Sequence, residues 1–96
     1  MVAAMLVIRE RVVYAGGCVA EMVVWRVPRP VPPAVHGFKY RIADIVDGKR
    51  VLGYDNERGK GDHRHAAGRE EAFAFVSIDD LLSRFVAEVE AMRRRS

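Results

Sequence analysis

The dipeptide Asp47-Gly48 stands between two runs of strand-forming residues, and no other feature of the sequence constrains the fold as much. Asp-Gly is favoured in the two-residue type I′ turn of a β-hairpin, because both residues of that turn need positive φ angles. The pattern therefore predicts two antiparallel strands, at residues 38–46 and 49–57.

Counting outward from this turn predicts the register of the hairpin. The expected pairs are Ile45–Arg50, Ala43–Leu52, Arg41–Tyr54, Tyr40–Asp55 and Lys39–Asn56. Side chains alternate between the two faces of a strand. One face is then expected to carry Lys39, Arg41, Tyr54 and Asn56, and the other Tyr40 and Asp55.

The N-terminal third of the chain predicts a second hairpin. Valine-rich runs at residues 5–14 and 18–27 flank Ala15-Gly16-Gly17. A three-residue loop places Arg11 opposite Glu21, a favourable cross-strand pair. All four prolines follow within residues 28–33, where they cannot donate ladder hydrogen bonds, and they predict a stiff extended connector.

The C-terminal half combines an irregular segment with a helix. Residues 57–71 are polar and glycine-punctuated, which predicts a long loop with a functional role or disorder. Residues 72–76 fit a short strand or an extended approach to the helix. Ser77 can cap a helix whose apolar stripe comprises Ile78, Leu81, Leu82, Phe85, Val86, Val89 and Met92.

These elements predict a single α+β domain over residues 1–96. It is expected to be an antiparallel β-sheet of two hairpins plus a short fifth strand, packed by the C-terminal α-helix. The single cysteine, Cys18, excludes an intramolecular disulfide and a Cys-rich zinc site. No apolar run is long enough to span a membrane and the N-terminal run does not resemble a signal peptide, so we expect a soluble, cytoplasmic protein.

The segment of residues 54–65 carries the residues best suited to phosphate chemistry. His63 and His65 would face one side of an extended strand, roughly 6–7 Å apart. One imidazole could remove the 2′-hydroxyl proton of RNA while the other protonates the leaving oxygen, without a metal. Lys60, Lys39 or Arg41 could stabilise charge on the transition state, whereas Arg64 would need a twist to join the histidines. The net charge of +3 points weakly to an acidic partner.

Other interpretations of the same segment stay open. His-x-His is also a common pair of metal ligands, with Asp62, Asp55 or His36 as a third, although the neighbouring cations disfavour a bound cation. The histidines could also have no role. Asp55 and Asn56 could orient a histidine or hold a loop, and Tyr54 could stack on a base or simply pack.

The order of three motifs resembles the TumE family of toxins from toxin–antitoxin systems. The motifs are Phe38-Lys39-Tyr40-Arg41, Gly53-Tyr54-Asp55-Asn56 and His63-Arg64-His65, and the resemblance covers about residues 36–86. The loop of residues 57–62 departs from the family, in which this loop commonly contains His and Pro. This loop therefore carries no additional histidine that could take part in the site.

The resemblance implies a growth-inhibiting toxin of a type II system, neutralised by a helix-turn-helix antitoxin protein. From the residues we infer an endoribonuclease that needs no cofactor. Its expected catalytic residues are His63, His65, Arg64 and Asp55. Its expected RNA-binding residues are Lys39, Arg41, Tyr54, Asn56 and Lys60. The alternative is a non-enzymatic or metal-binding module whose basic, histidine-bearing loop binds an antitoxin or nucleic acid, and an exposed edge strand would allow a homodimer.

Overall fold

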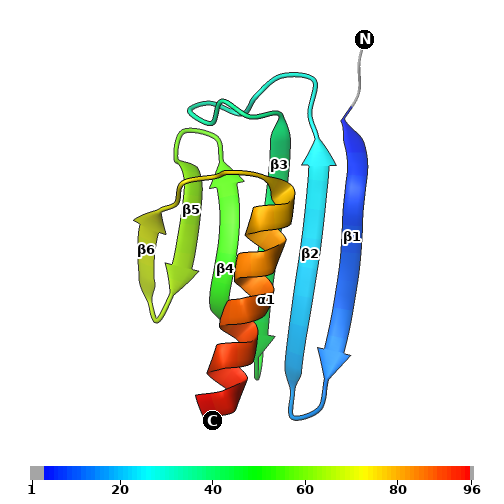
Figure 1. The fold of residues 1–96 in the computed structure, drawn as a ribbon, viewed down its shortest axis with the longest axis vertical. Helices are drawn as coiled ribbons and strands as arrows, with labels where there is room; N and C mark the ends of the chain where they lie inside the picture. Colours follow the sequence, from blue (N-terminus) through cyan, green and yellow to red (C-terminus); the bar gives the residue numbers. More distant parts are fainter. Residues whose placement is uncertain (1–3, 96) are drawn as a thin grey trace.

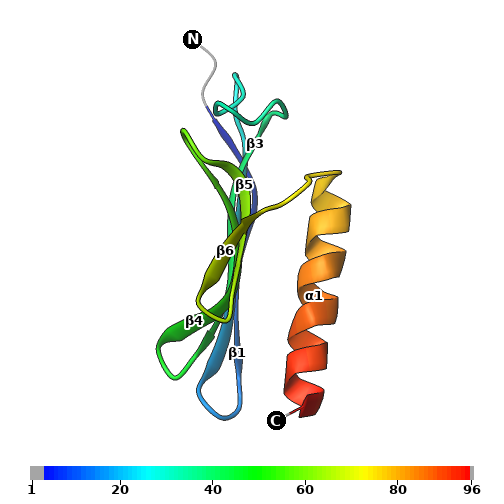
Figure 2. The same cartoon turned by 90° about the vertical axis from the view of Figure 1, so that its left-hand side faces the viewer.

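A computed structural model describes residues 4–95, so residues 1–3 and 96 of the expected 1–96 domain lie outside the described residues. One helix covers one face of an antiparallel sheet whose strands follow each other in sequence order (Figure 1 and Figure 2). The elements are β1 Met5–Tyr14, β2 Cys18–Arg26, β3 Phe38–Val46, β4 Lys49–Glu57, β5 Gly61–Ala66, β6 Arg69–Ala72 and α1 Ile78–Arg95. The predicted α+β class is confirmed. Within residues 4–95, no helix combines the length and apolar character that crossing a membrane requires.

The first hairpin has the predicted register. Arg11 lies opposite Glu21 and Val13 opposite Val19. The Arg11 Nε atom is 3.6 Å from Glu21 Oε1, so the expected cross-strand charge pair forms on this exposed hairpin.

The second hairpin has the predicted turn but a different register. Ile45 pairs with Arg50 as expected, and a bulge beside this pair then leaves Val51 without a directly opposite residue. From there outward the partners shift by one, so Ile42 lies opposite Tyr54 and Arg41 opposite Asp55. The predicted pairs beyond the bulge, and the predicted face assignment, are therefore wrong.

Residues 57–71 form a third hairpin where the sequence predicted a loop. Strand β5 pairs with β4 and β6, and Ala67 and Gly68 make the connecting turn with φ angles of 52° and 73°. For residues 72–76 the predicted extended approach to the helix is confirmed and the alternative of a short strand is wrong, because β6 ends at Ala72. The Phe73 N–H still donates to the Asp62 carbonyl of β5 at 3.0 Å. The hydrophobic pattern of the sequence did not reveal β5, because both faces of this strand carry polar side chains.

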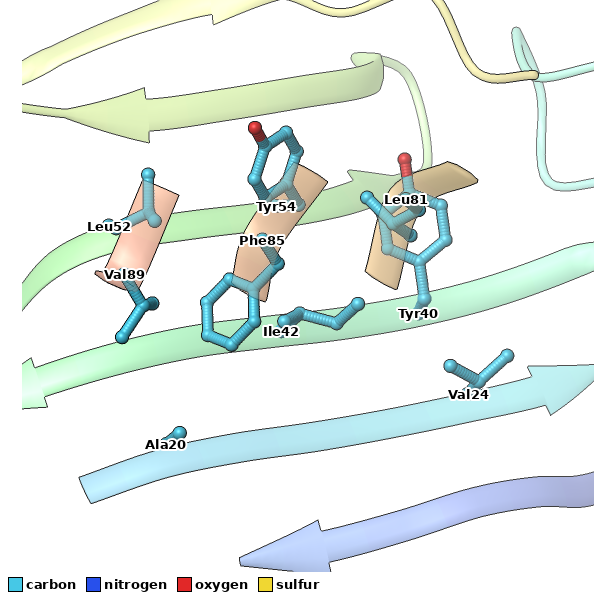
Figure 3. Packing of buried hydrophobic residues seen from close by; sticks show 9 residues of the cluster. All are labelled: Ala20, Val24, Tyr40, Ile42, Leu52, Tyr54, Leu81, Phe85 and Val89. Carbon is cyan, nitrogen blue, oxygen red and sulfur yellow. The ribbon is translucent and has the colours of Figure 1, made fainter. Parts of the chain in front are cut away.

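Helix α1 begins as predicted and buries one stripe of side chains against the sheet. The Asp80 N–H donates to Ser77 Oγ at 3.0 Å, which caps the helix. The buried cluster shown in Figure 3 comprises Ala20, Val24, Tyr40, Ile42, Leu52, Tyr54, Leu81, Phe85 and Val89. Each large member stabilises the fold by roughly 1.5–3 kcal/mol. Val86, expected in the stripe, is instead 48% exposed.

The proline-rich connector between β2 and β3 packs on the turn between β4 and β5. The Gly59 N–H donates to the Pro32 carbonyl at 2.8 Å. Gly61 has a φ of +77°, and a Cβ atom there would lie 3.2 Å from Pro33 Cγ. The connector therefore fixes the point at which β5 starts.

An ion pair joins β5 to the helix. Arg64 hydrogen-bonds Glu88 through both Nε and Nη2, with Nε 3.0 Å from Oε2, and the Tyr54 hydroxyl donates to the same carboxylate. Burial and the bond to Glu88 raise the pKa of Tyr54 to about 12. Burial opposes ionisation of Glu88, but the hydrogen bonds from Arg64 and Tyr54 outweigh it and lower the Glu88 pKa. The Glu88 carboxylate therefore connects the helix to the sheet at β4 and β5.

We expect Glu88→Gln to lower the free energy of unfolding by about 1–3 kcal/mol, because Arg64 loses its charged acceptor. Glu90→Gln, on an exposed position of the same helix, is the matched control and should change it by less than about 0.5 kcal/mol. Urea unfolding of both variants measures the difference. Because the folded-state Glu88 pKa lies below its ordinary 4.5, this stabilisation is complete above pH 4.5 and is lost as the pH falls through the lower value. A wild-type advantage that stays constant into strong acid would contradict this account.

Candidate functional site

The face of the sheet opposite α1, called here the open face, carries the histidine pair. In β5 Arg64 points to the helix, so its neighbours His63 and His65 point to the open face. His63 lies opposite Asp55 and His65 opposite Gly53 on β4. Their side chains are 19% and 18% exposed, which leaves each imidazole reachable from solvent but held by its surroundings.

Asp55 holds His65. The His65 Nε2 atom is 3.4 Å from Asp55 Oδ1, and Arg50 Nη1 is 3.6 Å from Asp55 Oδ2. Arg50 reaches this carboxylate by lying across Gly53, where an added Cβ would meet Arg50 Cδ at 3.0 Å. Asp55 is only 8% exposed, so its charge acts on His65 with little screening by water.

His63 has different contacts. Its Nδ1 atom is 3.1 Å from the Gly61 carbonyl, and its Nε2 atom lies 4.0 Å from Glu70 Oε1. Lys60, at the turn before β5, has its Nζ atom 3.5 Å from the same Glu70 oxygen. Lys60 therefore lies at the edge of the histidine pair and shares a carboxylate with His63.

Lys39 and Arg41 line a hollow of about 380 Å³ beside the histidines on the open face. The other lining residues that matter here are Trp25, Arg50, Asp55 and Glu57. The Lys39 Nζ atom donates to the Asn56 carbonyl at 2.8 Å, which holds its ammonium group at the hollow. Asp55 thus separates two cations of the hollow from the histidine pair.

Three of the sequence-predicted site residues lie on the helix side instead. Arg64 is bound to Glu88, and Tyr54 is 2% exposed with its ring edge-on to Phe73 at 5.0 Å between centroids. Asn56 is fully buried. Its side chain accepts from the Tyr40 N–H at 2.9 Å and donates to the Phe38 carbonyl at 2.7 Å. The bulge at Val51 causes the difference for Tyr54 and Asn56, because it reverses which face each presents.

His36 and Asp62, considered as further metal ligands, form a separate cluster on the helix side. Asp62 Oδ1 lies 2.8 Å from His36 Nε2 and accepts from the Tyr40 hydroxyl at 2.5 Å. The His36 ring stacks on Phe75 with centroids 3.8 Å apart. Burial and the bond to Asp62 raise the pKa of Tyr40. No three His, Cys, Asp or Glu side chains in the described part of the chain gather as a metal-binding group.

Sequence reasoning missed Arg50 and Trp25 as open-face residues. Gly53, opposite the midpoint of β5, was the signal for Arg50, because a glycine inside a strand often marks the close approach of another group. Trp25 shares the parity of Glu21 in β2, so strand alternation places the two on one face.

A family model described as "Toxin TumE" matches residues 3–93, nearly the whole chain. This chain belongs to the TumE toxin family. It is accordingly a toxin of a toxin–antitoxin system, and the family implies an antitoxin partner. Neither a comparison with curated proteins nor one with solved structures found a match.

We expect the neutral forms of His63 and His65 to be different tautomers. His63 should carry its proton on Nδ1, which faces the Gly61 carbonyl, and His65 on Nε2, which faces Asp55. His36 should carry it on Nε2, because its Nδ1 atom accepts from the Phe38 N–H. Long-range ¹H–¹⁵N correlation spectra at alkaline pH distinguish the two forms. The same tautomer at His63 and His65 would contradict the geometry described.

Proposed function

We propose that this toxin is a metal-independent endoribonuclease of a type II system, with His63 and His65 as its acid and base. The observation that carries the proposal is the anchoring of the two imidazoles. Each has one nitrogen facing a fixed acceptor, the Gly61 carbonyl or Asp55. Within residues 4–95, neither His63 Nε2 nor His65 Nδ1 forms a hydrogen bond, and Glu70 Oε1 lies 4.0 Å from His63 Nε2, so both nitrogens can contact a substrate on the open face.

The different anchors suggest different roles. His63, neutral with its proton on Nδ1, has its Nε2 lone pair available to remove the 2′-hydroxyl proton. Asp55 holds His65 through Nε2, and the protonated imidazole gives its Nδ1 proton to the departing 5′-oxygen. The 2′-oxygen bonds to phosphorus as the bond to the 5′-oxygen breaks, which yields a 2′,3′-cyclic phosphate and a 5′-hydroxyl. Asp55 acts as a positioning residue in this scheme.

Cations next to the histidines support an RNA substrate. Arg41 lies opposite Asp55, and Lys39 lies on the same face of β3. With Lys60 on the other side of His63, these residues can contact the phosphates that flank the scissile one. Tyr54, Asn56 and Arg64 have positioning roles in this proposal. Tyr54 and Arg64 tie β4 and β5 to Glu88 of α1, and Asn56 ties β4 to β3.

The same surface suggests how an antitoxin would neutralise the toxin. A helix-turn-helix antitoxin with an acidic segment could cover the cations and histidines of the open face at once. This arrangement would exclude RNA while both proteins are present in the cytoplasm.

The decisive experiment incubates the purified toxin with total RNA in excess chelator. We expect cleavage to 2′,3′-cyclic phosphate ends, reduced about 10²- to 10⁴-fold by His63→Ala and by His65→Ala. His36→Gln, a histidine substitution away from the pair, is the control, and all variants are checked for folding by circular dichroism. No cleavage by wild type, with or without added divalent metal, would instead support a non-enzymatic binding module. Cleavage that requires added metal would support the metal alternative.

Arg41→Gln should weaken RNA binding, because the neutral side chain no longer pairs with a phosphate. We expect lower affinity and a log–log salt slope that is shallower by about 0.7 for each phosphate of single-stranded RNA that is no longer neutralised. Arg84→Gln on α1, the matched control, removes another exposed guanidinium, which pairs with Asp80 away from the open face. Fluorescence anisotropy of a labelled oligoribonucleotide, measured in the His63→Ala background, gives both quantities. An equal effect of the two substitutions would show that only net charge matters.

A further inference from the structure

The geometry points to Trp25 as the stacking platform for one base of a single-stranded RNA, in the hollow beside the histidine pair. This inference rests on the proposed RNA substrate, and it adds a base-binding subsite to a site so far described only by its phosphate and proton chemistry. Trp25 is the only tryptophan of the chain and lies on the open face of β2.

The first argument is that the indole has no internal partner. Within residues 4–95, no aromatic ring stacks on Trp25 and its indole N–H donates no hydrogen bond. The side chain is half-buried, so one part of the ring is fixed and another part lines the hollow. Large aromatic side chains that help to hold a fold usually pack into the core, which in this protein lies on the opposite face.

The second argument is the pairing of Trp25 with cations. Lys39 lies directly opposite Trp25, and Arg41 lies opposite Val23, one step along the same face of β2. An aromatic platform flanked by cations is the usual arrangement for binding single-stranded nucleic acid, in which bases stack while phosphates pair with Lys or Arg. The hollow of about 380 Å³ falls within the usual size range of small-molecule sites, and a single base would fit it.

The third argument is continuity with the histidines. Val23, Arg41, Asp55 and His63 form one cross-strand row from β2 to β5. Neighbouring strands are about 4.8 Å apart, so this row spans about 14 Å of the open face. A strand of RNA with its scissile phosphate at the histidines can cross Arg41 and place a neighbouring base on Trp25.

Fluorescence of the single tryptophan tests the inference directly. The protein carries His63→Ala and His65→Ala, and the probes are a short single-stranded oligoribonucleotide and an abasic oligomer of equal length and charge. We expect the oligoribonucleotide, but not the abasic oligomer, to quench the Trp25 emission. Trp25→Leu should weaken binding of the oligoribonucleotide about 5- to 100-fold and leave binding of the abasic oligomer unchanged. Trp25→Phe should retain most of the affinity, because it retains an aromatic face.

Several results would overturn the inference. The absence of quenching is one, and an equal loss of affinity for both oligomers in Trp25→Leu is another. Loss of antitoxin binding in Trp25→Leu with unchanged RNA binding would assign the hollow to the protein partner instead. Base-dependent quenching without cleavage by the wild type would support the subsite and reject the nuclease, so the two proposals fail separately.

Discussion

The structure depends on burying the apolar stripe of α1 against one face of the sheet, whose other face is not covered by a second layer within residues 4–95. The apolar stripe packs on the central strands through Leu81, Phe85 and Val89. The period-two alternation of each strand then divides its residues between an apolar interior and the open face. Histidines and cations can gather on the open face because it does not have to exclude water.

Within this constraint, successive residues of β4 and β5 face the helix and the open face in turn. In β5, Arg64 binds the helix through Glu88 while His63 and His65 face the opposite side. In β4, Tyr54 also reaches Glu88 while Asp55 turns to the histidines. The geometry of the proposed site therefore depends on contacts made on the face opposite to it.

The sequence predicted what local chemistry determines and missed what tertiary contacts determine. The Asp47-Gly48 turn, the Ser77 cap and the register of the first hairpin were predicted correctly, because turn and cap residues have local preferences. The bulge at Val51 was not predicted. The predicted register placed the largely apolar Tyr54 opposite Arg41, an unfavourable pair that already pointed to a shift. Strand β5 was missed because the partners of its polar side chains come from β4, β6 and α1. The sequence grouped His63, His65 and Asp55 and placed both imidazoles on one side of an extended strand. The contact between Asp55 and His65 depends on the pairing of β4 with β5, which was not predicted.

The buried side chain of Asn56 substitutes for main-chain pairing between β3 and β4, because it bonds the Tyr40 N–H and the Phe38 carbonyl. Tyr54, Asp55 and Asn56 are consecutive, yet they contact the helix, the open face and the neighbouring strand respectively. A one-residue insertion or deletion in this stretch would exchange the faces of all three. A change of length here would therefore disrupt three separate contacts at once, whereas a single substitution disrupts one of them.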